Sequence, residues 1–348
     1  MNTTHKILYQ DSRDMGSISP NSVDLMITSP PYPMIEMWDG IFSQQNPDIK
    51  EALKNKNEDI VFELMHKELD KVWSEVYRVL KVGGIACINI GDATRTLNET
   101  FQIYPNHARI LNYCLNLGFH ALPSILWVKE TNSPNKFMGS GMLPVGAYVT
   151  LEHEHILILR KNDKRNFEAK EEKIRRLQSA FFWEERNIWF SDKWRDIKGA
   201  LQKLNHEKLR ERSGAYPLEL VYRLINMFSI YRDIILDPFL GTGTTTLGAM
   251  ISGRNSIGIE IDNNFDNIIK KRINEITPFS KERNLERLNA HLEFIKNHNK
   301  EIKYKSSHYK FDVKTRQEKE MKFYHITNIH QVENNIFETR YEETNLIT

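Results

Sequence analysis

The sequence predicts an α/β protein built around one mostly parallel sheet. Short apolar runs alternate with segments whose apolar residues recur at helical spacing, a pattern typical of parallel sheets with crossover helices. Two of the apolar runs end abruptly in turns rich in proline or glycine. The chain has 348 residues, 40% of them hydrophobic, which fits one large domain with additions or two domains.

The first half of the chain supplies five expected strands and two expected helices. The run VDLMIT at residues 23–28 ends at two prolines, which cannot continue a central strand. Residues 62–80 carry apolar side chains at helical spacing and stop before a glycine pair. The expected strands are residues 6–9, 23–28, 85–90, 122–129 and 155–160, and the second helix is residues 107–117. Residues 131–146 are an expected loop, and the polar residues 40–60 an expected inserted loop or lid.

The α/β pattern is interrupted at residues 161–212 and then resumes. The interruption is highly charged and contains Trp183, Trp189 and Trp194. The resumed pattern consists of expected helices at residues 217–228 and 246–252 and expected strands at residues 234–236 and 256–261. Beyond about residue 275 the chain is polar, and it allows a helix at residues 285–295 and a small strand pair at residues 323–336.

The composition excludes several classes of protein. The chain has 48 Lys and Arg against 46 Asp and Glu, a balance that does not by itself indicate a nucleic-acid partner. Its two cysteines, Cys87 and Cys114, lie in apolar patterns and fit buried thiols better than a disulfide framework or a zinc site. No apolar run approaches the ~20 residues of a membrane span, and the N-terminus is too polar for a signal peptide. We therefore expect a soluble cytoplasmic protein without a membrane partner.

A glycine-rich turn after residues 234–236 predicts a nucleoside-binding site. Glycine permits positive φ and close approach of a ligand to the backbone, and the next helix offers unpaired N–H groups. Glu260 ends the following strand and is placed to bind ribose hydroxyls. A dinucleotide site is a rival interpretation, but G-x-G-x-x-G would require glycine where Thr246 stands. Asp237 would also repel a pyrophosphate, whereas it would pair with an ammonium group. A plain structural turn is the other alternative.

The turn Ser29-Pro30-Pro31-Tyr32 predicts binding of an aromatic amine. Ligands of open α/β sheets bind outside the carboxyl ends of the strands, so this turn and the glycine turn are expected to face one crevice. The prolines lack N–H groups, and the turn therefore presents acceptors, the carbonyl oxygens and the Ser29 hydroxyl. Tyr32 offers an aromatic face for a base. A rigid turn without chemistry is the alternative, and it is weaker once the glycine turn is considered beside it.

Together the two turns make the chain resemble the DNA amino-methyltransferases of bacterial restriction–modification systems. The catalytic motif of that family, (Asp/Asn/Ser)-Pro-Pro-(Tyr/Phe), is matched by residues 29–32, and its cofactor motif, Asp-Pro-Phe-x-Gly-x-Gly-Thr-Thr, by residues 237–245. The catalytic motif comes first, as in the circularly permuted subgroup called β. The resemblance covers about residues 5–270. It implies a Rossmann-like, S-adenosylmethionine-dependent methyltransferase fold.

The resemblance assigns roles to the residues that match the family's motifs. The catalytic residues that it implies are Ser29, Pro30, Pro31 and Tyr32. The residues that it implies for S-adenosylmethionine are Asp11 for the adenine amino group, Ser213 and Tyr216 over the methionine end, Asp237, Pro238, Phe239, Gly241, Gly243 and Thr244 in the methionine wall, and Glu260 for the ribose. No metal is implied: His153 and His155 share one strand face, but without a third ligand they fit a structural role.

The implied activity is methyl transfer to an amino group of a base in double-stranded DNA. The serine form of the motif favours N4 of cytosine, with N6 of adenine as the alternative. Hydrogen bonds from the amine to the Pro30 carbonyl and the Ser29 hydroxyl would make the nitrogen more nucleophilic, and the base must leave the duplex to reach Tyr32. No strong general base is apparent near the motif. A restriction endonuclease is the implied functional partner, not necessarily a physical one. A non-catalytic DNA-binding module and an RNA methyltransferase are the rival functions.

The implied organisation has four parts. Residues 1–160 form the catalytic half of the methyltransferase domain, and residues 213–275 form its cofactor-binding half. Residues 161–212 are the expected target-recognition region, with the loop at residues 131–146 as a candidate addition to it. Seven Lys and Arg against four Asp and Glu in residues 161–176 fit phosphate contacts, and a solvated helix with tryptophans in a local core is an equal alternative. Residues 276–348 are a polar C-terminal extension.

Overall fold

The computed structural model describes residues 1–129, 138–199, 216–299 and 301–345. Ten strands form the central sheet: β1 (Asn2–Tyr9), β2 (Val23–Thr28), β3 (Leu80–Ile90), β6 (Phe119–Val128), β9 (His153–Lys161), β10 (Lys193–Trp194), β11 (Ile234–Asp237), β12 (Asn255–Glu260), β15 (Tyr324–Glu333) and β16 (Ile336–Glu343). Their order across the sheet is β10-β6-β9-β3-β2-β11-β12-β1-β16-β15. Three small hairpins lie outside it: β4 (Ala93–Leu97) with β5 (Thr100–Tyr104), β7 (Met138–Gly139) with β8 (Ala147–Tyr148), and β13 (Tyr304–Lys305) with β14 (Asp312–Val313).

The centre of the sheet is parallel, as the alternating pattern predicted. Strands β3, β2, β11, β12 and β1 are neighbours and run in one direction. Strand β9 is antiparallel to both β3 and β6, and β16 is antiparallel to both β1 and β15, so the sheet is mixed at its sides. After β2 the chain continues to β3, on one side of the sheet, and after β11 it continues to β12, on the other side. Such a switch point between β2 and β11 is where open α/β sheets form a ligand crevice.

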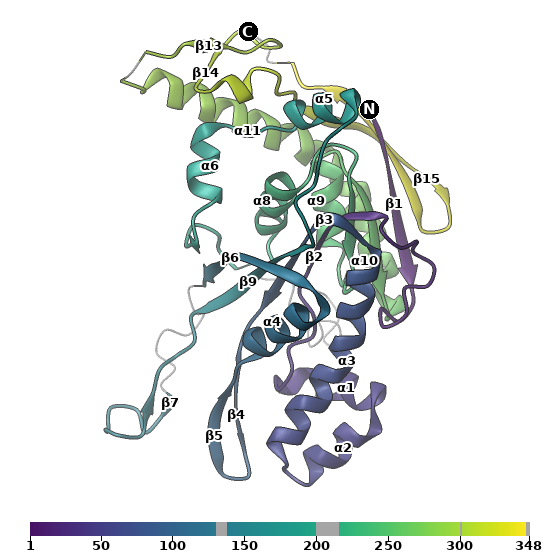
Figure 1. Ribbon diagram of the computed structural model, residues 1–348, viewed down its shortest axis with the longest axis vertical. Coiled ribbons are helices and arrows are strands. Elements are labelled where there is room, and N and C mark those ends of the chain that lie inside the picture. Colours follow the sequence, from purple (N-terminus) through teal and green to yellow (C-terminus); the bar gives the residue numbers. More distant parts are fainter. Residues whose placement is uncertain (130–137, 200–215, 300, 346–348) are drawn as a thin grey trace.

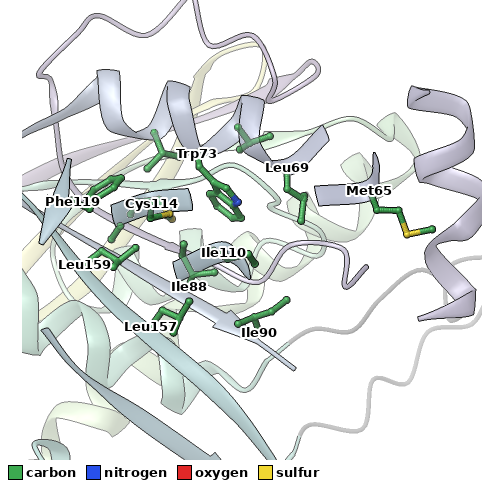
Figure 2. Close-up of a cluster of buried hydrophobic side chains, with 14 of the residues drawn as sticks. Met65, Leu69, Trp73, Ile88, Ile90, Ile110, Cys114, Phe119, Leu157 and Leu159 are labelled. Atoms are coloured by element: carbon green, nitrogen blue, oxygen red, sulfur yellow. The ribbon is translucent and has the colours of Figure 1, made fainter. Parts of the chain in front are cut away.

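Helices cover both faces of the sheet (Figure 1). The helices of the described residues are α1 (Asp39–Gln45), α2 (Pro47–Lys54), α3 (Glu58–Val79), α4 (Asn106–Leu117), α5 (Lys170–Gln178), α6 (Trp183–Trp189), α8 (Leu218–Phe228), α9 (Thr244–Ile251), α10 (Asp266–Glu275) and α11 (Thr277–Lys296), with short 3-10 turns at Glu36–Trp38, Asn263–Phe265 and Arg316–Glu318. Because strand side chains alternate between faces, Ile88 of β3 packs with α3 and α4, whereas its neighbour Cys87 packs with α8. Figure 2 shows the first of these layers, with Trp73 of α3 and Cys114 of α4 beside Ile88 and Leu157.

The predicted strands and helices of the α/β part are present, with ends that differ by a few residues. The prediction of a loop at residues 40–60 is wrong, because α1, α2 and the start of α3 occupy this stretch. Helix α2 begins at Pro47, directly after Asn46, whose side chain accepts a hydrogen bond from the Asp48 N–H. Asparagine as N-cap and proline at the first position are ordinary helix-start signals, which the polar composition concealed.

The C-terminal extension is folded onto the sheet. The strand pair expected at residues 323–336 extends further than predicted, because this range holds β15 and only the first residue of its antiparallel partner β16. Strand β16 also pairs with β1, as Asn2 with Arg340. Helix α11 includes the helix expected at residues 285–295. Phe182, just before α6, lies in one apolar cluster with Leu288 of α11 and with Phe323. The extension and part of the predicted target-recognition region therefore share a core. Within the described ranges, no helix is long and apolar enough to cross a membrane.

Candidate active site

The two turns predicted from the sequence meet at one edge of the sheet. Strands β2 and β11 are hydrogen-bonded neighbours, with Leu25 opposite Ile235. Because they are parallel, the turns that follow them emerge side by side at the carboxyl edge. Thr28, the last residue of β2, donates a hydrogen bond from Oγ1 to Oδ1 of Asp237, the last residue of β11, over 2.7 Å. The turns thus lie in one place, as their positions in the sequence predicted.

A cavity of about 1070 Å³ lies at this edge and is lined by both turns. Clefts for one small molecule usually measure about 300–1,000 Å³, so this cavity has room for a cofactor and part of a second ligand. Of the residues predicted from the sequence, the cavity is lined by Asp11, Ser29, Pro30, Pro31, Tyr32, Tyr216, Pro238, Phe239, Gly241, Thr244 and Glu260. Asp237 and Gly243 are not among the lining residues, and Ser213 lies outside the described residues.

The Asp237 carboxylate makes its hydrogen bonds inside the protein. Its side chain is buried, and it accepts hydrogen bonds from Thr28, from the Tyr216 hydroxyl at 3.0 Å, from the Thr245 hydroxyl at 2.5 Å and from the Phe239 N–H at 3.0 Å. Burial raises the pKa of Asp237 above its ordinary value. The carboxylate therefore joins the end of β2, the segment before α8 and the start of α9. That it also pairs with a ligand's ammonium group stays a prediction.

Two glycines shape the turn that follows Asp237. Gly241 has φ +54° and Gly243 has φ +84°, in the left-handed region that favours glycine. Gly241 lines the cavity, and a Cβ added to it would meet no atom within 4 Å. A Cβ on Gly243 would instead come within 3.2 Å of the Ile269 side chain. Gly241 therefore leaves the backbone open to a ligand, and Gly243 allows α10 to pack closely behind the turn.

Glu260, at the end of β12, keeps acceptor capacity toward the cavity. Its Oε2 accepts from the Gly241 N–H at 2.7 Å, and its Oε1 accepts from the Asp262 N–H at 2.9 Å. A carboxylate offers about four acceptor positions, so two remain for hydroxyl donors. Burial raises the pKa of Glu260 above its ordinary value. The next residue, Ile261, has 54% of its surface exposed and adds an apolar surface to the cavity wall.

Asp11 lies just after β1, on the cavity wall. Burial alone would raise its pKa, but hydrogen bonds from Arg13 outweigh burial and hold the pKa of Asp11 below its ordinary value. Arg13 Nη2 lies 2.6 Å from Asp11 Oδ2, and Arg13 Nη1 lies 2.5 Å from Oε2 of Glu68 on α3. Asp11 is thus an ionised acceptor held in one position at the cavity wall.

Three cavity residues beside the catalytic turn were missed from the sequence: Asn89, Lys129 and Glu154. The Tyr32 hydroxyl accepts from Ser29 Oγ at 3.1 Å and from Asn89 Nδ2 at 2.9 Å, and it donates to Glu154 Oε2 at 3.0 Å. A polar residue near the end of the apolar run IACINI was a signal for Asn89. Glu154 was hidden between two histidines that suggested a metal, and only the pairing of β9 with β3 brings it to the turn.

One histidine of the pair, His155, has two other potential metal ligands beside it in the fold, whereas His153 is not part of that group. Asp92, His107 and His155 each have a potential ligand atom within 4.8 Å of the others, the one such group among the described residues. However, the rings of His107 and His155 are stacked, with centroids 3.8 Å apart and planes inclined by 11°. Two stacked imidazoles cannot both direct a nitrogen, in the plane of its ring, at one ion. The cluster is better described as a hydrogen-bonded one, with His107 Nδ1 at 2.8 Å from Asp92 Oδ2.

The basic stretch at the start of residues 161–212 lies at the opposite edge of the sheet. Arg165 pairs with Asp233 at 2.6 Å and with Asp24 at 3.4 Å. Asp24 is near the start of β2 and Asp233 directly precedes β11, so this contact is at the amino edge, away from the cavity. Trp189 and Trp194 are 4% and 1% exposed. Trp189 and Trp194 therefore belong to a local core, as one of the two interpretations of the segment held, whereas Trp183 is 38% exposed.

Known proteins resemble this chain over most of its length. The N6/N4 family model, described as DNA methylase, matches residues 23–271. The chain is 52% identical to the type II methyltransferase M.MthZI of Methanothermobacter thermautotrophicus over 99% of this chain and 97% of that protein. It is 49% identical to M.MjaI of Methanocaldococcus jannaschii over 78% of this chain and 91% of that protein.

A solved structure shares the fold. A putative DNA modification methylase of Thermus thermophilus, in complex with S-adenosyl-L-methionine, is 31% identical, with a TM-score of 0.61 over 79% of this chain and 95% of that one. The family model covers both turns and every strand from β2 to β12. This chain therefore belongs to the N6/N4 family of DNA methylases.

Proposed function

We propose that this protein is a type II DNA methyltransferase that transfers a methyl group from S-adenosylmethionine to N4 of cytosine in double-stranded DNA. The observation that carries the proposal is the meeting of the Ser29–Tyr32 turn and the Asp237–Thr244 turn at one cavity, joined by the Thr28–Asp237 hydrogen bond. Two relatives at about half identity are named type II methyltransferases, which supports a role beside a restriction endonuclease. The catalytic turn precedes the cofactor turn along the chain, which supports the circularly permuted, Rossmann-like arrangement.

The cavity suits S-adenosylmethionine better than a phosphate-bearing nucleotide. Glu260 has free acceptor positions for two ribose hydroxyls, Asp11 offers an acceptor to an adenine amino group, and Gly241 leaves the backbone open. Two carboxylates, Glu260 and Asp11, on the cavity wall would repel a pyrophosphate. When bound, this cofactor supplies a methyl group on a positively charged sulfur. Thr244 at the start of α9 is in the wall and places the positive end of that helix toward a carboxylate ligand.

The catalytic turn suits a base with an exocyclic amine. Ser29 Oγ and the Pro30 carbonyl oxygen are acceptors for the two amine hydrogens, and Tyr32 presents an aromatic ring in the same wall. Acceptors aimed at the amine stabilise the positive charge that develops on nitrogen as the new bond forms. Such a base must be extruded from the duplex, because the amine is otherwise out of reach. The serine in the first position favours cytosine over adenine.

We place the DNA-facing surface at the carboxyl edge of the sheet. The β4–β5 hairpin follows β3 at that edge, and residues 138–149 lie between β6 and β9; both extend from the sheet on the side of α1 and α2 (Figure 1). Phe101 of the hairpin stacks on Tyr148, with ring centroids 4.5 Å apart. Met142 and Val145 are 81% and 99% exposed, and apolar side chains of this kind can enter a base stack. Arg195 and Lys198 line the cavity, so the later part of residues 161–212 keeps a role in recognition.

Nucleoside mass spectrometry tests the proposal. The protein is incubated with duplex DNA and methyl-deuterated S-adenosylmethionine, and the DNA is digested to nucleosides. We expect deuterated N4-methyldeoxycytidine. Deuterated N6-methyldeoxyadenosine would replace the cytosine assignment with adenine, and label found only in a parallel RNA reaction would overturn the DNA assignment. Absence of label from every substrate, while the protein still binds DNA, would favour a non-catalytic binding module.

A further inference from the structure

Glu154 lies at the end of a chain of hydrogen bonds that starts at the catalytic serine. Its Oε2 accepts from the Tyr32 hydroxyl at 3.0 Å and from Asn89 Nδ2 at 2.6 Å, while its Oε1 contacts Lys129 Nζ. The Glu154 side chain is only 13% exposed. All of these residues line the cavity. A nearly buried carboxylate therefore lies two hydrogen bonds away from Ser29.

The available hydrogens give this chain a direction. Tyr32 has one hydroxyl hydrogen and donates it to Glu154. The oxygen of Tyr32 accepts from Asn89 Nδ2 and from Ser29 Oγ, which uses both of its acceptor positions. The hydrogen of Ser29 is consequently directed at Tyr32, and the lone pairs of Ser29 Oγ remain for a donor in the cavity. Ser29 is thus set as an acceptor, which is the role that an incoming amine requires.

The hydrogen bonds of Asn89 agree with this direction of donation, from Ser29 through Tyr32 to Glu154. Its Nδ2 donates to both Tyr32 and Glu154, which fixes which end of the amide is nitrogen. Its side chain is 2% exposed, and its Oδ1 has no hydrogen-bond partner among the residues that the structure describes. Buried acceptors are usually paired. The amide thus keeps Nδ2 on the relay, where it donates to both Tyr32 and Glu154.

We propose that Glu154 is a positioning residue of the methyltransferase site and the final acceptor of a Ser29–Tyr32–Glu154 proton relay. This inference rests on the function proposed above and supplies the base that is not apparent near the motif in the sequence. Glu154 acts through Tyr32 and Ser29 and does not itself touch the target base. Lys129 balances its charge before the proton arrives.

The relay balances the transfer reaction. The amine nitrogen forms a bond to the methyl carbon as the carbon–sulfur bond breaks, and the sulfur leaves with that electron pair as a neutral thioether. The methylated nitrogen then carries one positive charge and two hydrogens. One of these protons passes to Ser29 Oγ while the Ser29 proton passes to Tyr32 and the Tyr32 proton to Glu154. The products are a neutral secondary amine and a protonated Glu154, which returns its proton to water when the cavity opens.

Two variants interrupt the relay while they keep its shape. Tyr32→Phe retains the aromatic face but removes the hydroxyl, and Glu154→Gln retains the length of the side chain but removes the base. We expect each variant to lower the single-turnover rate of methyl transfer by about 100-fold or more, with cofactor and DNA dissociation constants within about threefold of the wild-type values. Glu152→Gln is the matched control, since it removes the same charge from an exposed position two residues earlier.

Chemical rescue separates proton transfer from a structural role. Glu154→Ala leaves space where a small carboxylate can bind, so formate should restore a large part of the rate and formamide, of similar shape, should not. Wild-type rates in both Tyr32→Phe and Glu154→Gln would overturn the relay. Equal rescue by formate and formamide, or a loss confined to binding affinity, would overturn it as well. These results differ from failure of the proposed function itself, in which the wild-type protein would methylate no base at all.

Discussion

The two edges of the central sheet use acidic side chains in different ways. At the amino edge, Asp24 pairs with Lys81 and Arg165, and Asp233 pairs with Arg165. At the carboxyl edge, Glu260 borders a cavity and accepts hydrogen bonds from two backbone N–H groups, those of Gly241 and Asp262. The amino edge uses these carboxylates to hold strand ends together. At the carboxyl edge Asp237 has that structural role, whereas Glu260 keeps acceptor positions available for a ligand.

Part of the predicted target-recognition region, residues 161–212, contributes to the amino edge, and its role in recognition stays a prediction. Residues 161–176 hold seven Lys and Arg against four Asp and Glu, yet Arg165 is engaged with buried aspartates at the amino edge. The guanidinium groups of Arg165 and Arg176 also lie over the Phe167 ring, at 4.7 and 4.5 Å from its centroid. A count of positive residues therefore does not by itself show which side chains are available to a phosphate.

The largest effect is expected from Tyr32→Ala at the carboxyl edge. The substitution removes the aromatic face and the hydroxyl that links Ser29 to Glu154. We expect methyl transfer to fall by at least about 100-fold, while the thermal unfolding midpoint changes little because Tyr32 is only half-buried. Single-turnover rates and a thermal melt of the same sample measure both. Full activity in this variant would contradict the proposed site.

Asp237→Ala should damage both activity and stability. Its carboxylate accepts from three hydroxyls and one backbone N–H in a buried location, and each buried donor left without an acceptor costs about 1–3 kcal/mol. We expect a folded but less stable protein with weakened cofactor binding and a lower rate of methyl transfer. Calorimetric titration with S-adenosylmethionine and urea unfolding provide the measurements. Unchanged cofactor affinity would show that cofactor binding does not depend on the hydrogen bonds that Asp237 makes between the two turns.

Arg165→Ala should lower stability alone. Asp24 and Asp233, each with a 3% exposed side chain, would lose a charged partner, and breaking a buried ion pair typically costs about 3–5 kcal/mol. We expect urea unfolding at neutral pH to show this loss, with the transfer rate and DNA affinity of the folded protein unchanged. Lys164→Ala, at the exposed neighbouring position, is the charge-matched control. If Arg165→Ala and Lys164→Ala lowered the affinity for DNA by similar amounts, residues 161–176 would be a phosphate-binding surface after all.

The smallest effect concerns pH and His5, inside the sheet rather than at either edge. Burial lowers the pKa of His5 to about 3. Between pH 6.5 and 3 the unfolded chain therefore binds a proton at this histidine that the folded protein does not, so stability is complete above pH 6.5 and falls as the pH drops. From about pH 7 to about pH 5 we expect a loss of about 2 kcal/mol that is absent in His5→Gln. Urea unfolding at both pH values measures it, and equal losses in the two proteins would contradict it.

The sequence predicted most of the sheet because buried parallel strands appear as apolar runs bounded by turns. Residues 23–28 and 234–236 were recognised in this way, and the motifs that follow them identified most of the predicted residues that line the cavity. The helices at Asp39–Gln45 and Pro47–Lys54 were missed because they are short and polar, and only the second has a side-chain cap, Asn46, that marks its start. The sequence did not indicate whether Trp189 and Trp194 face DNA or a protein core, because aromatic side chains occur in both environments.

Glu154 could not be predicted as part of the site for a different reason. Its contact with Tyr32 joins residues 122 positions apart and depends on the antiparallel register of β9 against β3, in which Ile90 lies opposite His155. Local spacing shows that Glu154 and His155 lie on opposite faces of a strand, but it does not show which face meets the catalytic turn. Asp237 illustrates the same limit: its position was predicted, but its four protein donors became visible only in the fold.

The most direct test of a single site built from two distant turns is a crystal structure with a cofactor analogue and a duplex oligonucleotide that contains the target sequence. We predict that the analogue lies between Glu260 and the glycine turn, and that an extruded cytosine places its amine against Ser29 and Pro30 in the same cavity. An analogue bound elsewhere, or a base whose amine contacts neither Ser29 nor Pro30, would contradict the account.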